Sequence, residues 1–163
     1  GRLARLARAF DMRVIGVRRD PSAGAEGSDE VHGLDALPRL WGQADIVALT
    51  CPLTPETTGL VNARALAAMK PGAQLVNLAR GRVVDEPALI EALRAGRLAA
   101  AALDVTVEEP LPESSPLWTL PNVLITPHTG GETRRYEDAV IELLLENLGR
   151  LWRGETNLRN QVV

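Results

Sequence analysis

Three side chains that could together perform acid–base chemistry on an anionic substrate follow short apolar runs of the sequence. Arg80 stands in N-L-A-R-G, Glu109 lies five residues beyond Asp104, and His128 stands in T-P-H-T-G-G. An arginine binds carboxylates, a histidine exchanges a proton near neutral pH, and a neighbouring carboxylate favours the protonated imidazole. Each has an ordinary structural alternative: a surface arginine, a turn-capping glutamate or a loop histidine. Their joint occurrence at the ends of neighbouring strands indicates a catalytic site.

A second set of residues is spaced as in a dinucleotide-binding unit. Gly1 stands where the last glycine of a G-x-G-x-x-G fingerprint opens a helix whose N-terminus faces pyrophosphate. About 20 residues after such a fingerprint, a strand ends at a residue that reads the adenosine ribose. Arg18 and Arg19 occupy that position. An acidic residue there would bind the 2′-hydroxyl of NAD, whereas arginine suits a 2′-phosphate. On spacing alone, the alternative that Arg18 and Arg19 are solvated surface residues is equally consistent with the sequence.

The elements that must position these residues alternate between helical and strand patterns. The sequence predicts strands at residues 13–17, 45–49, 73–78, 98–105 and 122–126, and helices at residues 2–10, 35–43, 62–69, 85–96 and 131–153. Residues 19–33 and 106–121 are predicted loops, and a loop as long as the second is usually functional. Apolar strands that alternate with helices are typical of a parallel sheet covered on both faces. We therefore predict an α/β, doubly wound parallel sheet, in which ligands bind beyond the carboxyl ends of the strands.

Composition excludes several classes of function. The 163 residues carry 18 basic and 21 acidic side chains, a net charge of −3, which argues against electrostatic binding of nucleic acid. The single cysteine, Cys51, excludes an internal disulfide framework and a multi-cysteine metal site, and no other metal site is visible. No apolar run is long enough to span a membrane and no signal peptide opens the chain, so we expect a cytoplasmic protein without a membrane partner.

Four segments of the sequence occur together and in order, and they resemble one enzyme family. They are L-T-C-P-L-T-P-E-T-T-G-L-V-N at 49–62, L-V-N-L-A-R-G-R-V-V-D-E at 75–86, A-L-D-V-T-V-E-E-P-L-P at 102–112 and N-V-L-I-T-P-H-T-G-G at 122–131. Over essentially the whole chain, the sequence resembles the D-isomer-specific 2-hydroxyacid dehydrogenases, whose cofactor domain has a Rossmann-type fold. Glyoxylate/hydroxypyruvate reductases and 3-phosphoglycerate dehydrogenases are the most similar members in function.

The resemblance implies a role for each of the three catalytic candidates. Arg80 matches the arginine that binds the substrate carboxylate and polarises its carbonyl, His128 matches the acid/base, and Glu109 matches the carboxylate paired with it. The implied reaction transfers a hydride between a nicotinamide cofactor and a small 2-oxo or 2-hydroxy acid such as glyoxylate or hydroxypyruvate. In the reductive direction His128 would supply the proton as negative charge grows on the carbonyl oxygen.

The resemblance also implies a set of cofactor-binding residues. Asp104 matches the residue that hydrogen-bonds the nicotinamide carboxamide, and Arg18 stands where members that prefer NAD carry Asp, which favours NADP(H) over NAD(H). The full predicted set is Gly1, Arg18, Arg19, Cys51, Pro52, Leu78, Ala79, Arg80, Asp104, His128 and Gly130. Cys51 is expected to line the cofactor as a small residue, because no basic partner nearby in the sequence would make it a nucleophile.

The sequence departs from the family pattern at its beginning. The first sheet strand, the first two fingerprint glycines and the N-terminal part of the substrate domain are not in the sequence. We therefore interpret residues 1–131 as a dinucleotide-binding domain truncated at its N-terminus, and residues 132–163 as a helix and tail that return toward a substrate domain. The chain alone is expected to be weakly active or inactive.

Two further readings of the function remain open. Some relatives of this family act as nucleotide-sensing corepressors, so a binding module is one alternative, and an inactive fragment of the dehydrogenase is the other. Formate dehydrogenases resemble this sequence with Gln in place of Glu109, which makes that activity a weaker candidate. Family members commonly pair through the cofactor domain, so a homodimer is expected. Trp41, Trp118 and Trp152 are expected to be packing residues.

Overall fold

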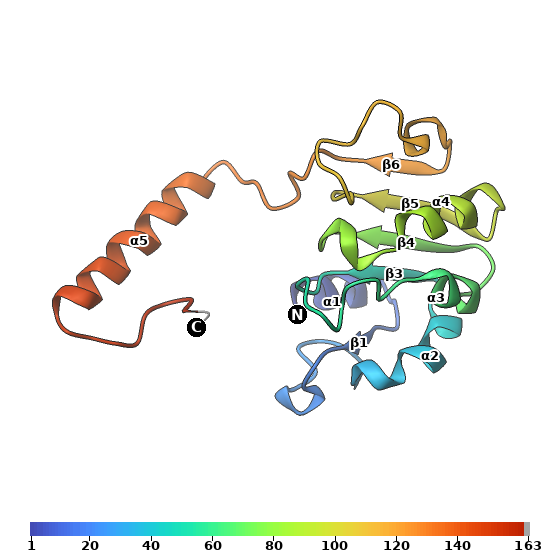
Figure 1. Ribbon diagram of the computed structural model, residues 1–163. Coiled ribbons are helices and arrows are strands. Elements are labelled where there is room, and N and C mark those ends of the chain that lie inside the picture. Colours follow the sequence, from blue (N-terminus) through green and yellow to red (C-terminus); the bar gives the residue numbers. More distant parts are fainter. Residues whose placement is uncertain (162–163) are drawn as a thin grey trace. The chain divides into compact units, whose positions relative to one another are not determined.

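Strands and helices alternate along most of the chain. The computed structural model describes residues 1–161, and the chain divides into two units between His128 and Thr129. The strands are β1 (Ile15–Val17), β2 (Glu30–His32), β3 (Ile46–Leu49), β4 (Ala73–Asn77), β5 (Leu98–Leu103) and β6 (Val123–Ile125) (Figure 1). The helices are α1 (Arg2–Ala9), α2 (Leu37–Leu40), α3 (Ala63–Ala68), α4 (Glu86–Arg94) and α5 (Tyr136–Trp152).

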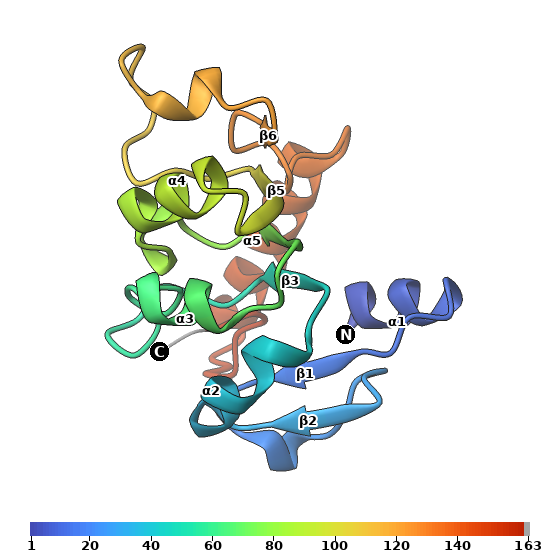
Figure 2. The same ribbon diagram turned by 90° about the vertical axis from the view of Figure 1, so that its right-hand side faces the viewer.

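All strand pairs are parallel, and they form two sheets. β1 pairs with β2, and the larger sheet has the order β3-β4-β5-β6. Helices α2, α3 and α4 lie on one side of the strands and α1 lies on the other, as Figure 2 shows. The predicted α/β class with parallel sheets is confirmed. Since parallel strands point the same way, the residues that follow β3 to β6 meet at one edge of the larger sheet.

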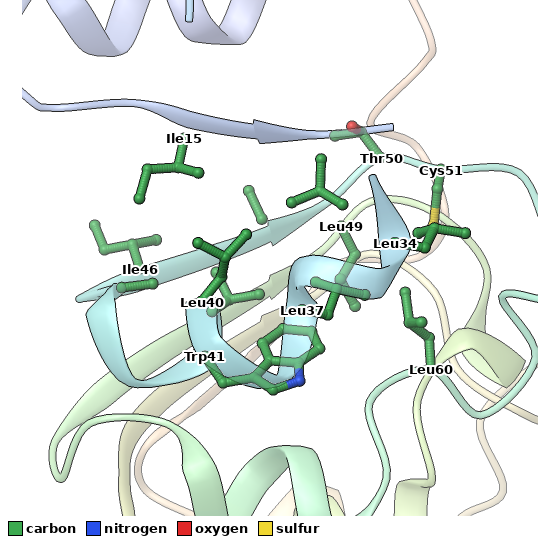
Figure 3. A pocket seen from close by; sticks show the side chains of 14 residues that line it. Ile15, Leu34, Leu37, Leu40, Trp41, Ile46, Leu49, Thr50, Cys51 and Leu60 are labelled. Atoms are coloured by element: carbon green, nitrogen blue, oxygen red, sulfur yellow. The ribbon is translucent and has the colours of Figure 1, made fainter. Parts of the chain in front are cut away.

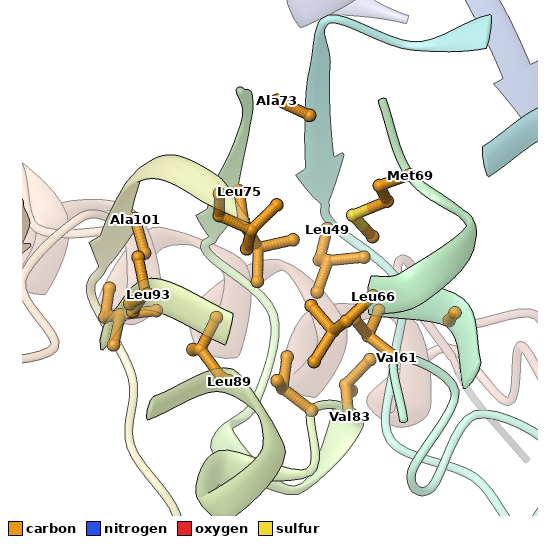
Figure 4. Packing of buried hydrophobic residues seen from close by; sticks show 14 of the residues in the cluster. Leu49, Val61, Leu66, Met69, Ala73, Leu75, Val83, Leu89, Leu93 and Ala101 are labelled. Carbon is orange, nitrogen blue, oxygen red and sulfur yellow. The ribbon is translucent and has the colours of Figure 1, made fainter. Parts of the chain in front are cut away.

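The hydrophobic core lies between the larger sheet and the helices that cover it. Leu75 in β4 and Leu98 in β5 are fully buried, and Leu66 of α3 and Leu89 of α4 pack against the same cluster (Figure 4). Each such side chain contributes about 1.5–3 kcal/mol through removal from water. This packing holds the strand ends in place, and the site depends on it.

Local sequence signals fix the two helices that flank the site. Asn62 caps α3, because its Oδ1 accepts the N–H groups of Arg64 and Ala65 at 3.0 and 3.1 Å. Asp85 caps α4 and accepts the N–H of Ala88 at 3.2 Å. Gly96 follows α4 with a φ of +65°, a left-handed conformation that favours glycine. The helix predicted at residues 85–96 is thus confirmed as α4, with Asp85 as its N-cap and Gly96 two residues after its last residue.

The predicted loop at residues 19–33 is wrong in part, because it contains β2. This strand has three residues, and Val31 is paired with Gly16 of β1. Its polar residue Glu30 forms an ion pair with Arg13, which precedes β1. A strand this short with polar alternate residues has no apolar run to signal it. Two strands are thus present where the sequence indicated one.

Three predicted boundaries also differ from the structure. The helix predicted at 35–43 is a single α-helical turn, α2, between two 3-10 turns, and Pro38 inside it has no N–H to donate. Strand β5 ends at Leu103 rather than at residue 105, although the Asp104 N–H still reaches the Asn77 carbonyl at 3.0 Å. Helix α5 begins at Tyr136 rather than at residue 131.

The tryptophans occupy different environments. Trp41 is buried, as expected of a packing residue, with 8% of its surface exposed. Trp118 is half exposed, although its indole N–H donates to the Pro112 carbonyl at 2.9 Å. Trp152, at the end of α5, is 85% exposed. The expectation that all three pack in the interior is therefore wrong for Trp118 and Trp152.

An apolar hollow of about 180 Å³ lies between β1 and β3 (Figure 3). Ile15 of β1 and Ile46 of β3 line it together with Leu37, Leu40 and Trp41. Among the described residues, β1 has one strand neighbour, β2, and β3 has one, β4. The two sheets are therefore separated by this hollow.

Candidate functional site

The candidate residues follow four consecutive strands of the larger sheet. Cys51 comes two residues after β3, Arg80 three residues after β4, and Asp104 directly after β5. His128 comes three residues after β6. Because these strands are parallel neighbours, their carboxyl ends bring together residues that are up to 77 positions apart, from Cys51 to His128. This is the edge at which open α/β sheets bind their ligands.

Glu109 and His128 form the central contact of the site. Glu109 Oε2 lies 2.8 Å from His128 Nδ1, and Glu109 Oε1 accepts the N–H of Thr106 at 3.0 Å. The carboxylate is therefore held through both of its oxygens. His128 has a φ of +59°, and its N–H donates to the Thr126 carbonyl at 3.0 Å. The structure brings together the acid/base candidate and the carboxylate that the sequence predicted to accompany it.

The charge state of Glu109 follows from these contacts. The hydrogen bond from His128 holds the pKa of the Glu109 carboxyl below its ordinary value, and the Thr106 N–H and the positive charge of Arg80 act in the same direction. Partial burial opposes them with a smaller effect than the His128 hydrogen bond. Glu109 is consequently ionised at neutral pH and can stabilise a protonated imidazole beside it.

Arg80 is presented by a backbone turn that the sequence did not signal as functional. Its guanidinium is exposed, and Nη1 donates to the Ala79 carbonyl at 2.6 Å. Beneath the turn lies Asn77, a fully buried residue that accepts the Ala79 N–H at 3.0 Å and donates to the Arg80 carbonyl at 3.2 Å. Asn77 therefore fixes the backbone that carries Arg80. The only signal for it was a polar residue at the end of an apolar strand.

The turns that carry Arg80 and Glu109 lie against each other. A Cβ atom on Gly81 would lie 1.9 Å from the Thr106 carbonyl oxygen, so the two backbones approach as only glycine permits. On the same side, Glu86 Oε2 accepts the N–H of Val107 at 3.1 Å. These two contacts fix the segment from Thr106 to Glu109 on the turn that follows Arg80. Glu86 and Thr106 are further residues that the sequence did not single out.

Asp104 is a buried carboxylate at the same edge. It is 6% exposed, and its Oδ1 accepts a hydrogen bond from the Thr126 hydroxyl at 2.5 Å. A buried carboxylate is costly unless it is hydrogen-bonded. The Thr126 hydroxyl provides one such hydrogen bond, and it comes from the strand end that also carries His128.

Three further cofactor candidates, at the N-terminus and after β1, lie near glutamate side chains. Arg18 follows β1 and donates through Nη1 to the Glu26 carboxylate at 3.1 Å and to the Gly24 carbonyl at 3.2 Å. Arg19 is exposed and lies 3.9 Å from Glu56. Gly1 is the N-cap of α1 and lies near the same Glu26 carboxylate, at 3.4 Å from its backbone nitrogen.

Two of the other predicted cofactor residues, Cys51 and Ala79, are partly or fully buried. Burial raises the pKa of the Cys51 thiol, which agrees with a lining role and not with a nucleophilic one. Pro52 accepts the Thr57 hydroxyl through its carbonyl at 2.7 Å. Leu78 is about half exposed. Gly130 belongs to the second unit, and its role stays a prediction.

Residues 1–161 contain neither a metal-ligating cluster nor a helix that could span a membrane. No cluster of three or more His, Cys, Asp or Glu side chains in this range could hold a metal ion. Within the same range, none of the helices has both the length and the apolar content that a membrane crossing requires.

Comparison with known protein families agrees with this geometry. Residues 1–130 match the model described as the D-isomer specific 2-hydroxyacid dehydrogenase, NAD binding domain. The chain belongs to this family. The matched range contains every predicted site residue, from Gly1 to Gly130, and the Rossmann-type interpretation of the fold is confirmed.

Several relatives and solved structures of the dehydrogenase family are similar to this chain. It is 42% identical over 155 residues to a glyoxylate reductase of Pyrococcus furiosus, covering 94% of this chain and 45% of that protein. It is 42% identical over 151 residues to a D-3-phosphoglycerate dehydrogenase of Methanocaldococcus jannaschii, covering 91% of this chain and 28% of that protein. The chain thus spans half or less of the length of these relatives.

A solved structure of the family has a similar fold. The D-isomer specific 2-hydroxyacid dehydrogenase of Xanthobacter autotrophicus Py2, in complex with NADPH and MES, matches with a TM-score of 0.87 and 46% identity. The match covers 97% of this chain and 63% of that one. The structure of a family member with a closely similar fold therefore contains NADPH.

Proposed function

We propose that this member of the dehydrogenase family carries the cofactor and the acid/base pair for the reduction of a small 2-oxo acid, such as glyoxylate or hydroxypyruvate. The observation that carries the proposal is the contact of 2.8 Å between Glu109 and His128 at the ligand-binding edge of the sheet, next to the turn of Arg80. Relatives named glyoxylate reductase and glyoxylate/hydroxypyruvate reductase, at 42–44% identity, support this choice of substrate.

The proposed roles follow from the chemistry of the three side chains. Arg80 would bind the substrate carboxylate with its planar fork and so orient the carbonyl. His128 would donate a proton to the carbonyl oxygen as charge develops there, and Glu109 would keep the imidazole protonated and correctly oriented. The nicotinamide supplies the hydride when the cofactor is bound. In the reverse direction neutral His128 would accept the hydroxyl proton.

The donor set at the sheet edge fits a nicotinamide dinucleotide. Asp104 offers a buried carboxylate that can accept the N–H of a carboxamide, and the half-buried Cys51 with the backbone around Pro52, Leu78 and Ala79 offers a small-residue wall. Gly1 opens α1, where a pyrophosphate is favoured by unpaired N–H groups. We include Gly130 in this set, and we assign residues 1–131 to the dinucleotide-binding domain and 132–163 to a segment that returns toward a substrate domain.

Within this function we propose a preference for NADP(H) over NAD(H). Arg18 and Arg19 follow β1, the position that reads the ribose, and two guanidinium groups complement a 2′-phosphate. Family structures in complex with NADPH, from Xanthobacter autotrophicus, and with NADP, from Rhizobium etli, support a phosphate-bearing cofactor. Glu26 already engages Arg18, so the cofactor phosphate would compete with this carboxylate.

The test of the cofactor proposal is a fluorescence titration of the chain with NADPH and with NADH. NADPH is expected to bind more tightly, and Arg18→Ala and Arg19→Ala should each weaken NADPH about tenfold and leave NADH unchanged. Arg39→Ala, an exposed arginine on α2, is the control. Equal binding of both cofactors by the chain and by both variants would contradict the preference.

The test of the activity proposal follows the loss of reduced-nicotinamide absorbance with glyoxylate and hydroxypyruvate in the natural full-length protein. We expect turnover in the parent protein and its loss in Arg80→Met and in His128→Gln. Tight cofactor binding without turnover on either acid would favour a nucleotide-sensing module, the alternative function.

We further propose that the protein is a homodimer in the cytoplasm, without nucleic-acid or membrane partners. The exposed apolar side chains of α5, among them Ile141, Leu144 and Leu145, support association, and the net charge of −3 argues against nucleic acid. Sedimentation velocity and cell fractionation test the two statements.

A further inference from the structure

The side chain of Thr126 contacts Asp104, and its backbone contacts His128. It follows β6, and its N–H donates to the Leu103 carbonyl at 2.9 Å, which extends the pairing of β5 with β6 by one step. We propose that Thr126 is a positioning residue that sets the orientation of the Asp104 carboxylate toward the nicotinamide and fixes the backbone that presents His128. The proposal rests on the cofactor-binding role given to Asp104 above.

The hydroxyl of Thr126 has a specific partner. Oγ1 donates to Asp104 Oδ1 at 2.5 Å, a distance typical of a strong hydrogen bond between a hydroxyl and an ionised carboxylate. Thr126 is exposed but Asp104 is buried, and removal of a donor from a buried carboxylate is costly. With one oxygen bound to a hydroxyl on the neighbouring strand, the carboxylate is held in one orientation at the sheet edge.

The backbone of Thr126 acts on the other half of the site. Its carbonyl accepts the N–H of His128 at 3.0 Å across Pro127, and His128 itself has a left-handed φ of +59°. A histidine in this conformation persists when neighbouring contacts hold it there. The same residue thus joins the proposed carboxamide acceptor to the proposed proton donor.

The functional consequence differs between the two ends of the cofactor. Asp104 would contact the carboxamide, whereas Arg18 and Arg19 would contact the adenosine phosphate. Loss of the Thr126 hydroxyl should therefore weaken binding through the nicotinamide and leave the adenosine end unaffected. A general loss of folding would weaken both ends, which separates positioning from a purely structural role.

The test compares Thr126→Val, which has nearly the same shape without the hydroxyl, with Thr126→Ser, which keeps the hydroxyl. Thr119→Val is the matched control, because the Thr119 hydroxyl donates only to the Pro116 carbonyl on an exposed turn among the contacts of the described residues. The first measurement is the set of three-bond couplings that report the side-chain rotamer of Asp104 in the 163-residue chain. One rotamer is expected in the parent chain, in Thr126→Ser and in Thr119→Val, and averaged couplings are expected in Thr126→Val. An unchanged single rotamer in Thr126→Val would overturn the proposal.

The second measurement titrates each protein with NADPH and with 2′-phosphoadenosine diphosphoribose, which has no nicotinamide. Thr126→Val should bind NADPH about tenfold more weakly and should bind the nicotinamide-free ligand with the affinity of the parent chain. Thr126→Ser should bind NADPH as the parent chain does. An equal loss for both ligands, or no loss for either, would contradict the positioning role. If the parent chain binds neither ligand, the proposed cofactor function fails, while the Asp104 couplings still decide whether Thr126 orients this carboxylate.

Discussion

At the scale of single residues, the contact between Glu109 and His128 is more important for chemistry than for stability. Their side chains are 38% and 44% exposed, and ion pairs with this exposure contribute little to the free energy of unfolding. The hydrogen bond from the Thr106 N–H orients the Glu109 carboxylate. A role in chemistry explains this orientation better than a contribution to stability. A substitution can separate the two contributions.

Replacement of Glu109 by Gln should lower turnover of the full-length protein by about a hundredfold, since proton transfer by a positioned group contributes at least that factor. The melting temperature should change little, because the pair is half exposed. The steady-state rate and thermal unfolding measure the two effects. Glu108→Gln is the control, because among the contacts of residues 1–161 Glu108 takes part only through its backbone carbonyl, which accepts the Thr106 hydroxyl. Equal rate losses in both variants would argue against a specific role for Glu109.

The same residue predicts how stability depends on pH. The His128 hydrogen bond lowers the pKa of Glu109, so the folded state favours the ionised carboxylate. Its contribution is complete above the ordinary glutamate pKa, about 4.3, and is lost as the pH falls through the lowered value of the folded state. Between pH 5 and pH 2, acid unfolding followed by circular dichroism should thus be less steep in Glu109→Gln than in the parent chain. Superimposable curves would contradict the pKa shift.

At the scale of elements, the turn after β4 and the segment after β5 act as one unit because their backbones touch at Gly81. Any side chain at this position would collide with the Thr106 carbonyl, because its Cβ would lie 1.9 Å from the carbonyl oxygen. The neighbouring hydrogen bond from Val107 to Glu86 would be displaced with it. The geometry of Arg80 relative to Glu109 therefore depends on a glycine that carries no functional group.

Substitution of Gly81 by Ala should destabilise the fold by about 3 kcal/mol, the upper part of the usual range for overpacking, and shift the segment that carries Glu109. Denaturant unfolding measures the first effect, and the amide resonances of Thr106 and Val107 measure the second. Gly131→Ala is the control, since a Cβ there meets nothing within 4 Å and its backbone is not left-handed. A Gly81→Ala chain with parent stability and unmoved resonances would show that the close approach is not required.

The elements also show what could be predicted from the sequence and why. Strands β3, β4, β5 and β6 contain apolar runs, so the pattern of apolar residues found them. Strand β2 was missed because it is held by pairing with β1 and by the contact of Glu30 with Arg13, and both are long-range. Propensity cannot anticipate an element of three residues that exists only through its neighbour.

The site was predictable to a similar extent. Arg80, Glu109 and His128 carry reactive groups just after strand ends, so their types and spacing made them candidates, and their roles stay predictions. Asn77 and Glu86 hold the backbone near Arg80 and Glu109, and Thr126 contacts Asp104 and His128, through atoms 2 to 22 residues away. Their side chains are ordinary in sequence, so only the folded geometry identifies them.

At the scale of the whole molecule, the chain consists of two units that meet at His128 and Thr129. Residues 130–135, which precede α5, are exposed and outside regular secondary structure, and they include Arg134 and Arg135. Exposed irregular backbone is the preferred place for proteolytic cleavage. The covalent link between the units should therefore be the most accessible part of the chain.

Limited trypsin digestion should cut first after Arg134 or Arg135 and release a stable fragment that contains residues 1–134. Mass spectrometry of the early products identifies the cut. In an Arg134→Gln, Arg135→Gln double variant, this fragment should not form, and the digestion should slow. A first cut within residues 1–128 would indicate that the first unit is less well ordered than its core implies.

The three tryptophans differ in exposure, so the intrinsic fluorescence of the chain reports mainly on one region. Trp41 alone is buried, and its indole forms part of the wall of the hollow between β1 and β3 (Figure 3). Trp118 and Trp152 are exposed to solvent, so their emission should already lie at long wavelength in the folded state. A red shift on denaturation would therefore come mainly from Trp41. The emission of the buried Trp41 should also change when a peptide segment or a small apolar molecule enters the hollow, so the measurement needs no added dye.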